Sequence, residues 1–420
     1  MSSTTYSLKA RYVFPVAGDP IADGVVTFDR ERIISVGPSV GDEADIEDLG
    51  NVAILPGLVN AHTHLEFSHL DRPIGYRGMT LGDWIARLVS ELRIEDRPPA
   101  DAVRRGLLES LMSGTTALGE IAQPDWSADD FQAVPIDCTV FLELISPTDA
   151  GVDEVLKLAH RHIAAGETYQ QMQLGWRWRP GICPHAPYSV HPRLLSEAAA
   201  ISARHKVPLS FHLAESPEEI EFLQTSGGVF RDMLELLEQW DPSAHRPGRR
   251  PFDLLRVLAP AHRLLIVHGN YLEDEEIAFI ARHAQTMSVV YCPRTHHYFG
   301  HIPHPLEKLL SSGVNVALGT DSRASSPDLN LLSDMRHVAH CHPAIALKTV
   351  LRMGTLGGAK ALGLEGELGT LEVGKRPHMA VLPLPDRREA DPHSLLFDQN
   401  APIRSTWFGG NCMDDPTSLG

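Results

Sequence analysis

The chain has 420 residues, 43% of them hydrophobic and 22% charged, which is enough for one large globular domain and a smaller one. Its formal net charge of −17 argues against nucleic acid or an anionic membrane as a partner, so we expect a small-molecule substrate. We find no apolar run of membrane-spanning length and no signal-peptide pattern at the amino terminus, so we expect a cytoplasmic protein. The sequence leaves open whether the chain forms a homo-oligomer.

Both ends of the chain contain short β segments broken by turns. Residues 1–57 are rich in β-branched residues interrupted by Gly, Pro and Asp, and residues 365–420 follow the same pattern. We therefore expect a small composite β-sandwich domain built from both chain ends. Residues 58–364 would form the larger domain between them.

This middle region alternates short apolar runs with amphipathic helical stretches. The eight runs are residues 57–62, 115–121, 138–144, 176–185, 208–215, 263–269, 286–293 and 314–321. Such alternation is typical of a parallel sheet covered by helices, and eight units predict an α/β fold of the (β/α)8 TIM-barrel type. The alternative is an open doubly wound sheet, but no GxGxxG motif follows its first strand.

Polar residues follow five of these expected strands at the point where each strand ends. They are His62 and His64, His185, His212 with Glu215, His268, and Asp321. In a barrel of parallel strands the carboxyl ends gather at one rim, where catalytic residues lie. The pattern therefore predicts one shared site.

His62 and His64 are two residues apart, so their side chains lie on the same side of a strand. A pair of this kind occurs often by chance and is weak evidence for a metal site. The strand-end residues His212 and Asp321 strengthen that prediction. Three imidazoles and one carboxylate suit a single divalent ion, most simply Zn²⁺ with iron as the alternative, and leave room for a bound water.

Glu215 follows one of these expected ligands closely. A carboxylate in that place can take a proton from water and give one to a leaving group, although an acid at a helix start is the alternative. His268 and His185 could be core histidines that satisfy their own hydrogen bonds. Their positions at strand ends favour contact with the water or the substrate.

Four segments together resemble the amidohydrolase superfamily, and within it the mononuclear deaminase and chlorohydrolase branch. They are LPGLVNAHTHLE (residues 55–66), FHLAES (211–216), VHGNYL (267–272) and LGTDS (318–322). The resemblance covers nearly the whole chain. It implies one divalent metal held by His62, His64, His212 and Asp321.

The resemblance also implies roles in catalysis. Glu215 would shuttle the proton, His268 would orient the attacking water, and Asp321 would help to deprotonate it. His185 lies where adenosine-type deaminases of this branch contact the purine. The implied reaction is attack of a metal-bound hydroxide on a ring carbon with release of ammonia.

The chain departs from relatives in two places. Pro377 and His378 stand where relatives usually have Ala-Asp, and we expect this to change local packing only. The segment CPRTHHYFGH, residues 292–301, replaces the usual Asn-Pro-x-Ser-Asn type of segment. Because this loop would face the substrate, it weakens any transfer of substrate from those relatives.

The segment after the first histidine pair is similar to that of aminodeoxyfutalosine deaminases. This resemblance implies that Glu66 and Trp84 face a 6-aminopurine nucleoside, with Glu66 on the side of the histidine pair if the chain stays extended. The alternatives are a helix-starting acid and a packed aromatic. Other candidate substrates are S-adenosylhomocysteine or methylthioadenosine, guanine and triazines. An inactive barrel acting as a binding protein would lack a ligand or the proton shuttle, and neither is missing here.

Overall fold

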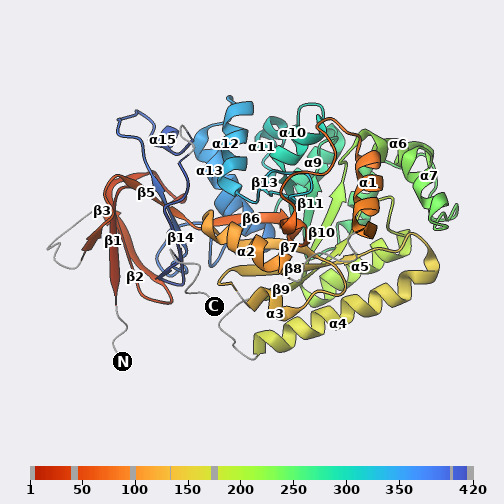
Figure 1. Cartoon of the computed structure of the whole chain (residues 1–420), viewed down its shortest axis with the longest axis horizontal. Coiled ribbons are helices and arrows are strands. Elements are labelled where there is room, and N and C mark those ends of the chain that lie inside the picture. Colours follow the sequence, from red (N-terminus) through yellow and green to blue (C-terminus); the bar gives the residue numbers. More distant parts are fainter. Residues whose placement is uncertain are drawn as a thin grey trace.

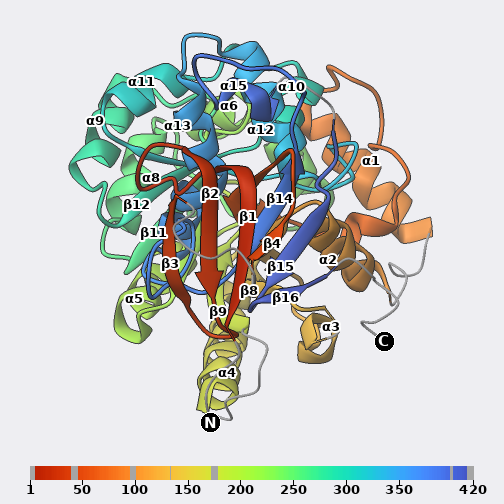
Figure 2. The ribbon, with the colours of Figure 1, turned by 90° about the vertical axis from the view of Figure 1, so that its left-hand side faces the viewer.

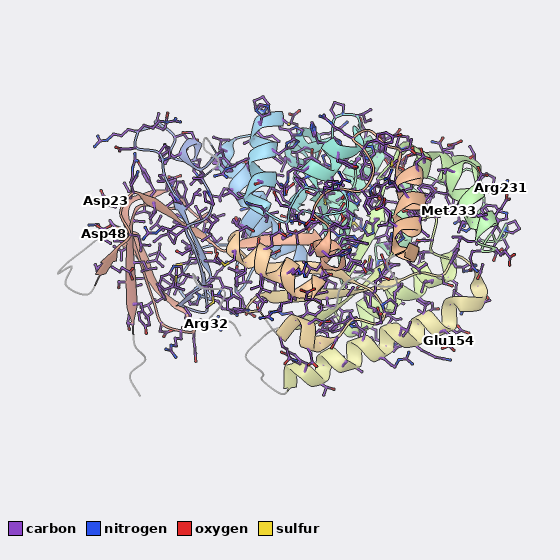
Figure 3. All side chains as sticks on the ribbon, viewed as in Figure 1. Asp23, Arg32, Asp48, Glu154, Arg231 and Met233 are labelled. Carbon is purple, nitrogen blue, oxygen red and sulfur yellow. The ribbon has the colours of Figure 1, made fainter. Side chains whose placement is uncertain are left out.

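The fold was analysed in a computed structural model of the chain. The structure describes residues 5–38, 46–94, 101–132, 134–171, 178–397 and 401–413. Figure 1 shows a small sheet at one end of the molecule and helices α6 and α7 at the other. In Figure 3, Asp23 and Asp48 mark the small sheet, and Arg231 marks α7 at the opposite end.

Eight parallel strands form the barrel, as the sequence predicts. They are β6 (Leu58–Thr63), β7 (Thr115–Ala122), β8 (Asp137–Leu144), β9 (Trp178–Pro184), β10 (Pro208–Leu213), β11 (Arg263–His268), β12 (Met287–Tyr291) and β13 (Asn315–Leu318), neighbours in that order. A parallel bridge between Thr63 and Asp321 brings the first strand against the end of the last. β6, β7 and β8 are buried along their whole length, which explains their continuous apolar character.

Helices cover the outside of this barrel. They are α1 (Leu81–Ile94), α2 (Ala102–Met112), α3 (Ala128–Gln132), α4 (Val152–Gln171), α5 (Pro192–His205), α6 (Pro217–Thr225), α7 (Val229–Leu236), α8 (Pro251–Leu258), α9 (Asp274–Arg282), α10 (Pro293–Phe299), α11 (Leu306–Ser311), α12 (Leu331–Cys341) and α13 (Leu347–Arg352). A π-helical turn at Met353–Gly357 leads into α14 (Gly358–Leu362). Of the helices in the described part of the chain, none is both long and apolar enough to cross a membrane.

The strands of the two chain ends share one mixed sheet, which Figure 2 shows face-on. Its strands are β1 (Tyr6–Val13), β2 (Ile21–Phe28), β3 (Ile33–Pro38), β4 (Ile46–Asp48), β5 (Val52–Pro56), β14 (Met379–Pro383), β15 (Ser405–Phe408) and β16 (Asn411–Cys412). β14 pairs with β5 in antiparallel register, with Val381 opposite Ile54. Both residues belong to one buried apolar cluster, so the two chain ends fold around a common core.

The limits of the two domains, residues 1–57 with 365–420 and residues 58–364, remain our proposal. Strand β5 ends at Pro56 and β6 begins at Leu58, so Gly57 alone separates the small sheet from the barrel. A Cβ at Gly57 would lie 2.1 Å from Oγ1 of Thr116, and only glycine fits this close crossing. The barrel is therefore fixed to the small sheet at the start of its first strand.

Candidate metal and proton-transfer site

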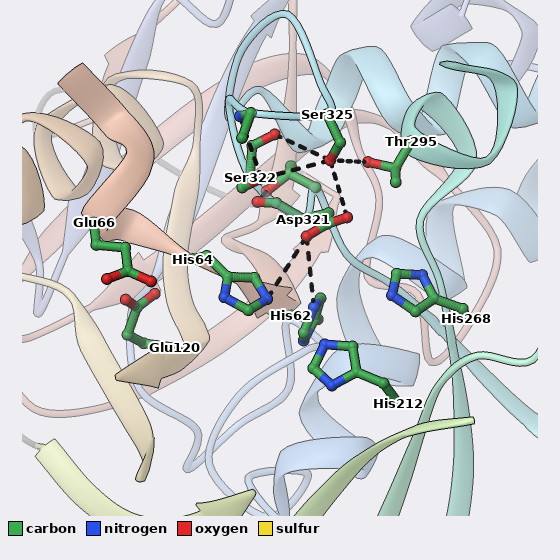
Figure 4. A network of polar contacts seen from close by, with 12 residues as sticks. His62, His64, Glu66, Glu120, His212, His268, Thr295, Asp321, Ser322 and Ser325 are labelled. Atoms are coloured by element: carbon green, nitrogen blue, oxygen red, sulfur yellow. Dashed lines mark hydrogen bonds and ion pairs between the residues drawn. The ribbon is translucent and has the colours of Figure 1, made fainter. Parts of the chain in front are cut away.

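The ends of two strands, β6 and β10, bring His62, His64 and His212 together, as expected. Each offers one ring nitrogen, and these nitrogens all lie within 4.8 Å of one another. Oδ1 of Asp321 is 3.7 Å from Nε2 of His62 and 3.7 Å from Nε2 of His64. Figure 4 shows the Asp321 carboxylate pointing at this group of imidazoles. The four expected metal ligands thus converge on one point at the rim of the barrel.

The hydrogen bonding around these histidines fits a cation. Both ring nitrogens of His62 are buried, and neither has a hydrogen-bond partner among the described residues. Nδ1 of His212 lies 2.9 Å from the carbonyl oxygen of His185, which fixes the ring and turns Nε2 toward the centre. A buried polar atom without a partner is costly, and a metal ion would satisfy it. These residues therefore fit a divalent metal.

The protonation of the cluster also suits metal binding. Burial lowers the pKa of His62 well below its usual value, and the neighbouring His64 and His212 lower it further. Burial likewise lowers the pKa of His212 to about 4. Imidazole binds a metal in its neutral form, so these rings need lose no proton to bind one at neutral pH.

Asp321 is held by hydroxyl groups on its other side. Ser325 Oγ donates to Oδ2 of Asp321 at 3.0 Å, and Ser325 also contacts the hydroxyl of Thr295 at 3.0 Å. Burial raises the pKa of Asp321 to about 6, although these hydroxyls oppose the shift. The network leaves Oδ1 of Asp321 facing the histidines (Figure 4).

Glu215 and His268 form the second part of the site. Oε1 of Glu215 lies 3.3 Å from Nε2 of His268, and both side chains are buried. The His268 ring stands beside those of His62 and His212, with centroids 5.7 and 5.4 Å away. Burial raises the pKa of Glu215 well above its usual value, and the charge of Asp321 adds to this. The carboxyl group of Glu215 therefore lies at the edge of the histidine cluster and holds a proton more readily than an exposed glutamate does.

Three residues around this site adopt left-handed backbone conformations that are rare outside glycine. Ala214 has φ 54°, His268 has φ 68° and Asp321 has φ 58°. Each lies at or just after the end of a barrel strand, where the turn directs polar side chains toward the rim. Such a residue costs about 1–3 kcal/mol, and strained residues of this kind concentrate at functional sites.

Buried polar side chains hold these turns, and the strand and helix patterns of the sequence do not predict them. Glu219 accepts the backbone N–H groups of Ala214 and Glu215, and Asn270 Nδ2 donates to the carbonyl oxygen of Glu215 at 2.9 Å. His304 Nε2 lies 3.0 Å from the carbonyl oxygen of His268. The spacing of Ser216 and Glu219 does match a helix-capping pattern, which was the available signal.

The expected extension of the chain from His64 to Glu66 is wrong. A short 3-10 helix, Leu65–His69, begins immediately after His64, so Glu66 does not continue the strand. Both carboxylate oxygens of the buried Glu120 accept the N–H of Leu65, at 2.9 and 3.1 Å, and this stabilises the turn. Figure 4 shows Glu66 beside Glu120, to one side of His64.

Glu66 and His185 nevertheless belong to one row of polar side chains along the rim of the barrel. Nε2 of Gln123 donates to Glu66 Oε1 at 3.3 Å and to Glu143 Oε2 at 2.8 Å. Oε1 of Glu143 is 3.9 Å from Nε2 of His185, whose ring centroid is 5.1 Å from that of His212. Burial raises the pKa of Glu66 to about 8, and Glu143 raises it further.

Trp84 is half-buried on α1 and packs against the rim. Its indole N–H donates to the carbonyl oxygen of Ala324 at 3.2 Å, and its ring meets Phe299 edge-on with centroids 5.6 Å apart. The segment expected to be a loop after strand seven contains helix α10, which supplies Phe299 and Thr295. Contact of Trp84 with a substrate stays a prediction.

Comparison with known proteins agrees with this geometry. The sequence model of the amidohydrolase family matches residues 53–413. The chain is 32% identical to a 5-methylthioadenosine/S-adenosylhomocysteine deaminase of Desulforudis audaxviator, over 88% of this chain and 83% of that protein. It is 29% identical to an aminodeoxyfutalosine deaminase of a Nitratiruptor species, over 87% of this chain and 88% of that protein. A crystal structure of a zinc-bound adenosine deaminase from Xanthomonas campestris is similar, with a TM-score of 0.78, 25% identity and coverage of 99% and 95%.

Proposed function

This chain belongs to the amidohydrolase family, and from that premise we propose that it is a metal-dependent hydrolytic deaminase of a 6-aminopurine nucleoside. The observation that carries the proposal is the convergence of three imidazoles and the Asp321 carboxylate beside the buried Glu215–His268 pair. Relatives that match along most of the chain act on adenine nucleosides by name, which supports this substrate class.

In the proposed reaction, His62, His64, His212 and Asp321 hold one divalent ion, most simply zinc, with iron as the alternative. Such an ion would lower the pKa of a water ligand to about 7, so that a nucleophile is available at neutral pH. The protein side chains supply the remaining requirements, which are proton transfer and orientation of the reactants.

Glu215 is proposed to move the protons. Hydrolytic deamination adds water to the carbon that bears the amino group, and it releases ammonia. A proton must leave the water, a ring nitrogen must receive one, and the amino group needs one to depart. The raised pKa of Glu215 allows its carboxyl group to hold the proton between these steps. His268, whose Nε2 lies 3.3 Å from Oε1 of Glu215, is proposed to orient the water. Asp321 is proposed to assist the deprotonation of that water.

The row of polar side chains formed by Glu66, Gln123 and Glu143 supports a nucleoside, and not a free base, as the substrate. Ribose hydroxyls donate hydrogen bonds, and carboxylates and amide oxygens accept them. These groups lie along the rim next to His185, which we propose contacts the purine. Guanine and triazines have no such hydroxyls. The aminodeoxyfutalosine-like assignment rests further on the segment that contains Glu66 and Trp84.

A methylthioadenosine or S-adenosylhomocysteine deaminase is the second candidate, because relatives with that name match over most of the chain. Both candidates deaminate the same ring and differ in the group attached to the ribose. The inactive binding protein is disfavoured, since the three histidines proposed as ligands lie together and Glu215, the proposed proton carrier, lies beside His268.

A substrate panel tests the proposal. The zinc-loaded protein is incubated with adenosine, methylthioadenosine, S-adenosylhomocysteine, aminodeoxyfutalosine, guanine and a chlorotriazine, and ammonia or chloride release is measured. We expect the highest kcat/KM with an adenine nucleoside. Activity on guanine or the triazine alone would overturn the nucleoside assignment. Inactivity on the whole panel, with metal bound, would favour the binding protein.

A further inference from the structure

A cavity of about 150 Å³ lies between β10 and helices α5, α6 and α8, apart from the site described above. Its apolar wall is formed by Val190, Leu195, Phe211, Phe222, Leu223 and Leu254. Among the described residues that line it there is no proposed metal ligand, proton carrier or substrate contact. Phe211 precedes His212 on β10, so the two side chains point to opposite faces of the strand. The cavity therefore lies behind the barrel wall.

Two buried polar atoms on the cavity wall lack partners. Nε2 of His245 and Oγ of Ser226 make no hydrogen bond within the described part of the chain. The residues are only 6% and 7% exposed. The His245 ring stacks on Trp240 with centroids 5.1 Å apart, and Phe222 meets it at 5.0 Å, so its orientation is fixed. Unpaired polar atoms at this depth are costly, which points to a ligand with polar groups of its own.

The mouth of the cavity carries unbalanced positive charge. Arg246 and Arg249 both line it, and no ion pair joins either of them to a described carboxylate within 4.0 Å. Asp253 also lies there; its carboxylate accepts the backbone N–H of Arg250 at 2.9 Å and keeps its negative charge, so the two arginines exceed the acids of the lining by one charge. Burial lowers the pKa of Arg249 and the charge of Arg246 lowers it further, while Asp253 acts in the opposite direction. The lining residues at the mouth therefore carry a net positive charge, which favours a ligand with one negative charge.

We propose that this cavity is a binding site for a small aromatic monocarboxylate of the size of benzoate. The ring would pack on Leu195, Phe211 and Leu254. The carboxylate would accept hydrogen bonds from Arg249, His245 and Ser226. An apolar space of about 150 Å³ is large enough for one benzene ring, which sets the size of the ligand. Each of the unpaired groups can donate, and a carboxylate only accepts, so the donors and the ligand match.

The site is close to the catalytic segment but separate from it. Helix α6 supplies Phe222 and Leu223 to the cavity, and Ser226 follows its last turn. The same helix is capped at its start by Ser216, the residue after Glu215. In Figure 1, α6 and α7 lie at the end of the molecule remote from the small sheet. The ligand would thus bind between the barrel and the helix that begins at the proton carrier.

Isothermal titration calorimetry of the zinc-loaded 420-residue chain with benzoate tests the proposal. We expect one binding site per chain, with benzamide and acetate at least about tenfold weaker, because each lacks either the charge or the ring. Arg249→Ala should weaken benzoate by about tenfold or more. Arg256→Ala is the matched control, since Arg256 is exposed on α8 and does not line the cavity; it should bind like the parent.

A second variant tests the cavity itself. Val257 lies at the mouth and is 39% exposed, so Val257→Trp can cover the opening with little disturbance of the core. It should abolish binding, while Val257→Ala retains it. Circular dichroism and the melting temperature establish whether each variant is folded. If Val257→Trp does not fold, the affinities of Arg249→Ala and Val257→Ala for benzoate decide the test.

Four results would overturn the proposal. They are no heat of binding at benzoate concentrations up to about 10 mM, unchanged affinity in Arg249→Ala, equal affinity for acetate or hexanoate, and displacement of benzoate by a purine nucleoside. The last result would place benzoate in the catalytic site. Because binding is measured without turnover, failure of the deaminase assignment would leave this test unaffected.

Discussion

The carboxylate of Glu219 joins helix α6 to the turn that carries Glu215. Its Oε2 accepts the backbone N–H of Glu215 at 3.0 Å, and its Oε1 accepts the N–H of Ala214 at 2.7 Å. Ala214 has the left-handed φ of 54°, so these bonds stabilise a strained turn. Glu219 thereby sets the position of the proposed proton carrier and does not itself reach the metal cluster.

We expect Glu219→Gln to lower kcat by about 10- to 100-fold with little change in KM. A glutamine has one acceptor oxygen, so one of the two N–H groups loses its partner and Glu215 shifts. The metal content should stay at one ion per chain. Steady-state kinetics and metal analysis measure both. Glu221→Gln, on the exposed side of α6, is the control and should match the parent. An unchanged kcat in Glu219→Gln would show that the turn is held without it.

Glu215→Gln should reduce kcat by roughly 10²- to 10⁴-fold, the range typical of a lost general acid–base group. The amide keeps the size of the side chain but cannot carry the proton. Bound metal and the affinity for an unreactive nucleoside analogue should be unchanged. Turnover close to that of the parent enzyme would remove Glu215 from the mechanism.

His62→Ala should lose both metal and activity, because His62 contributes a buried imidazole to the cluster and both its nitrogens are otherwise unpaired. Metal analysis of the purified protein after dialysis tests this. His69→Ala is the comparison: His69 is close in sequence, but it lies on the 3-10 helix outside the cluster. If His62→Ala retains one tightly bound ion, the first-strand pair is not part of the metal site.

The sequence predicted the barrel and its rim because both depend on local patterns. Buried parallel strands are continuously apolar, and the polar residues that end five of the eight strands are visible in the same pattern. His62, His212 and Asp321 could therefore be expected at one rim from strand order alone. Their convergence in the structure follows from barrel closure, which the bridge between Thr63 and Asp321 records.

What the sequence could not predict are contacts set by tertiary packing. Gln123 joins Glu66 and Glu143 across separate strands, and nothing in the neighbouring sequence of any of them indicates this. The turn after His64 is likewise invisible in the local sequence, because its acceptor, Glu120, comes from the next strand of the barrel. Long-range polar partners of this kind have no periodic signal in a single sequence.

His378 was expected to affect local packing only, and the structure shows a wider role. Its Nε2 lies 3.3 Å from Oδ2 of Asp137, the first residue of β8, and Arg376 contacts the same oxygen. Asp137 is 4% exposed. Burial alone would raise the pKa of Asp137, but the hydrogen bond from His378 and the charge of Arg376 outweigh it and hold this pKa below its usual value. The contacts of His378 and Arg376 with Asp137 link the barrel to the segment that leads into β14.

This link predicts a pH-dependent contribution to stability. Because the pKa of Asp137 is lower in the folded chain than in the unfolded one, its contribution is complete above about pH 4, the unfolded pKa, and is lost as the pH falls through the folded pKa. Asp137→Asn should therefore reduce the free energy of unfolding by about 3–5 kcal/mol at pH 7, since it removes the negative charge that faces the largely buried Arg376 guanidinium. The difference from the parent should shrink below about pH 4.

Urea unfolding of the metal-free parent and variant between neutral and acid pH measures this difference. Removing the metal from both keeps acid release of the metal out of the comparison, and protonation of the histidine cluster, which both proteins share, cancels in the difference. Asp149→Asn is the matched control, because Asp149 pairs with Arg193 at 2.6 Å but its side chain is 62% exposed. An exposed pair of this kind contributes about 0–1 kcal/mol. If Asp137→Asn costs no more than Asp149→Asn, the buried contact with Arg376 and His378 does not stabilise the junction between barrel and sheet.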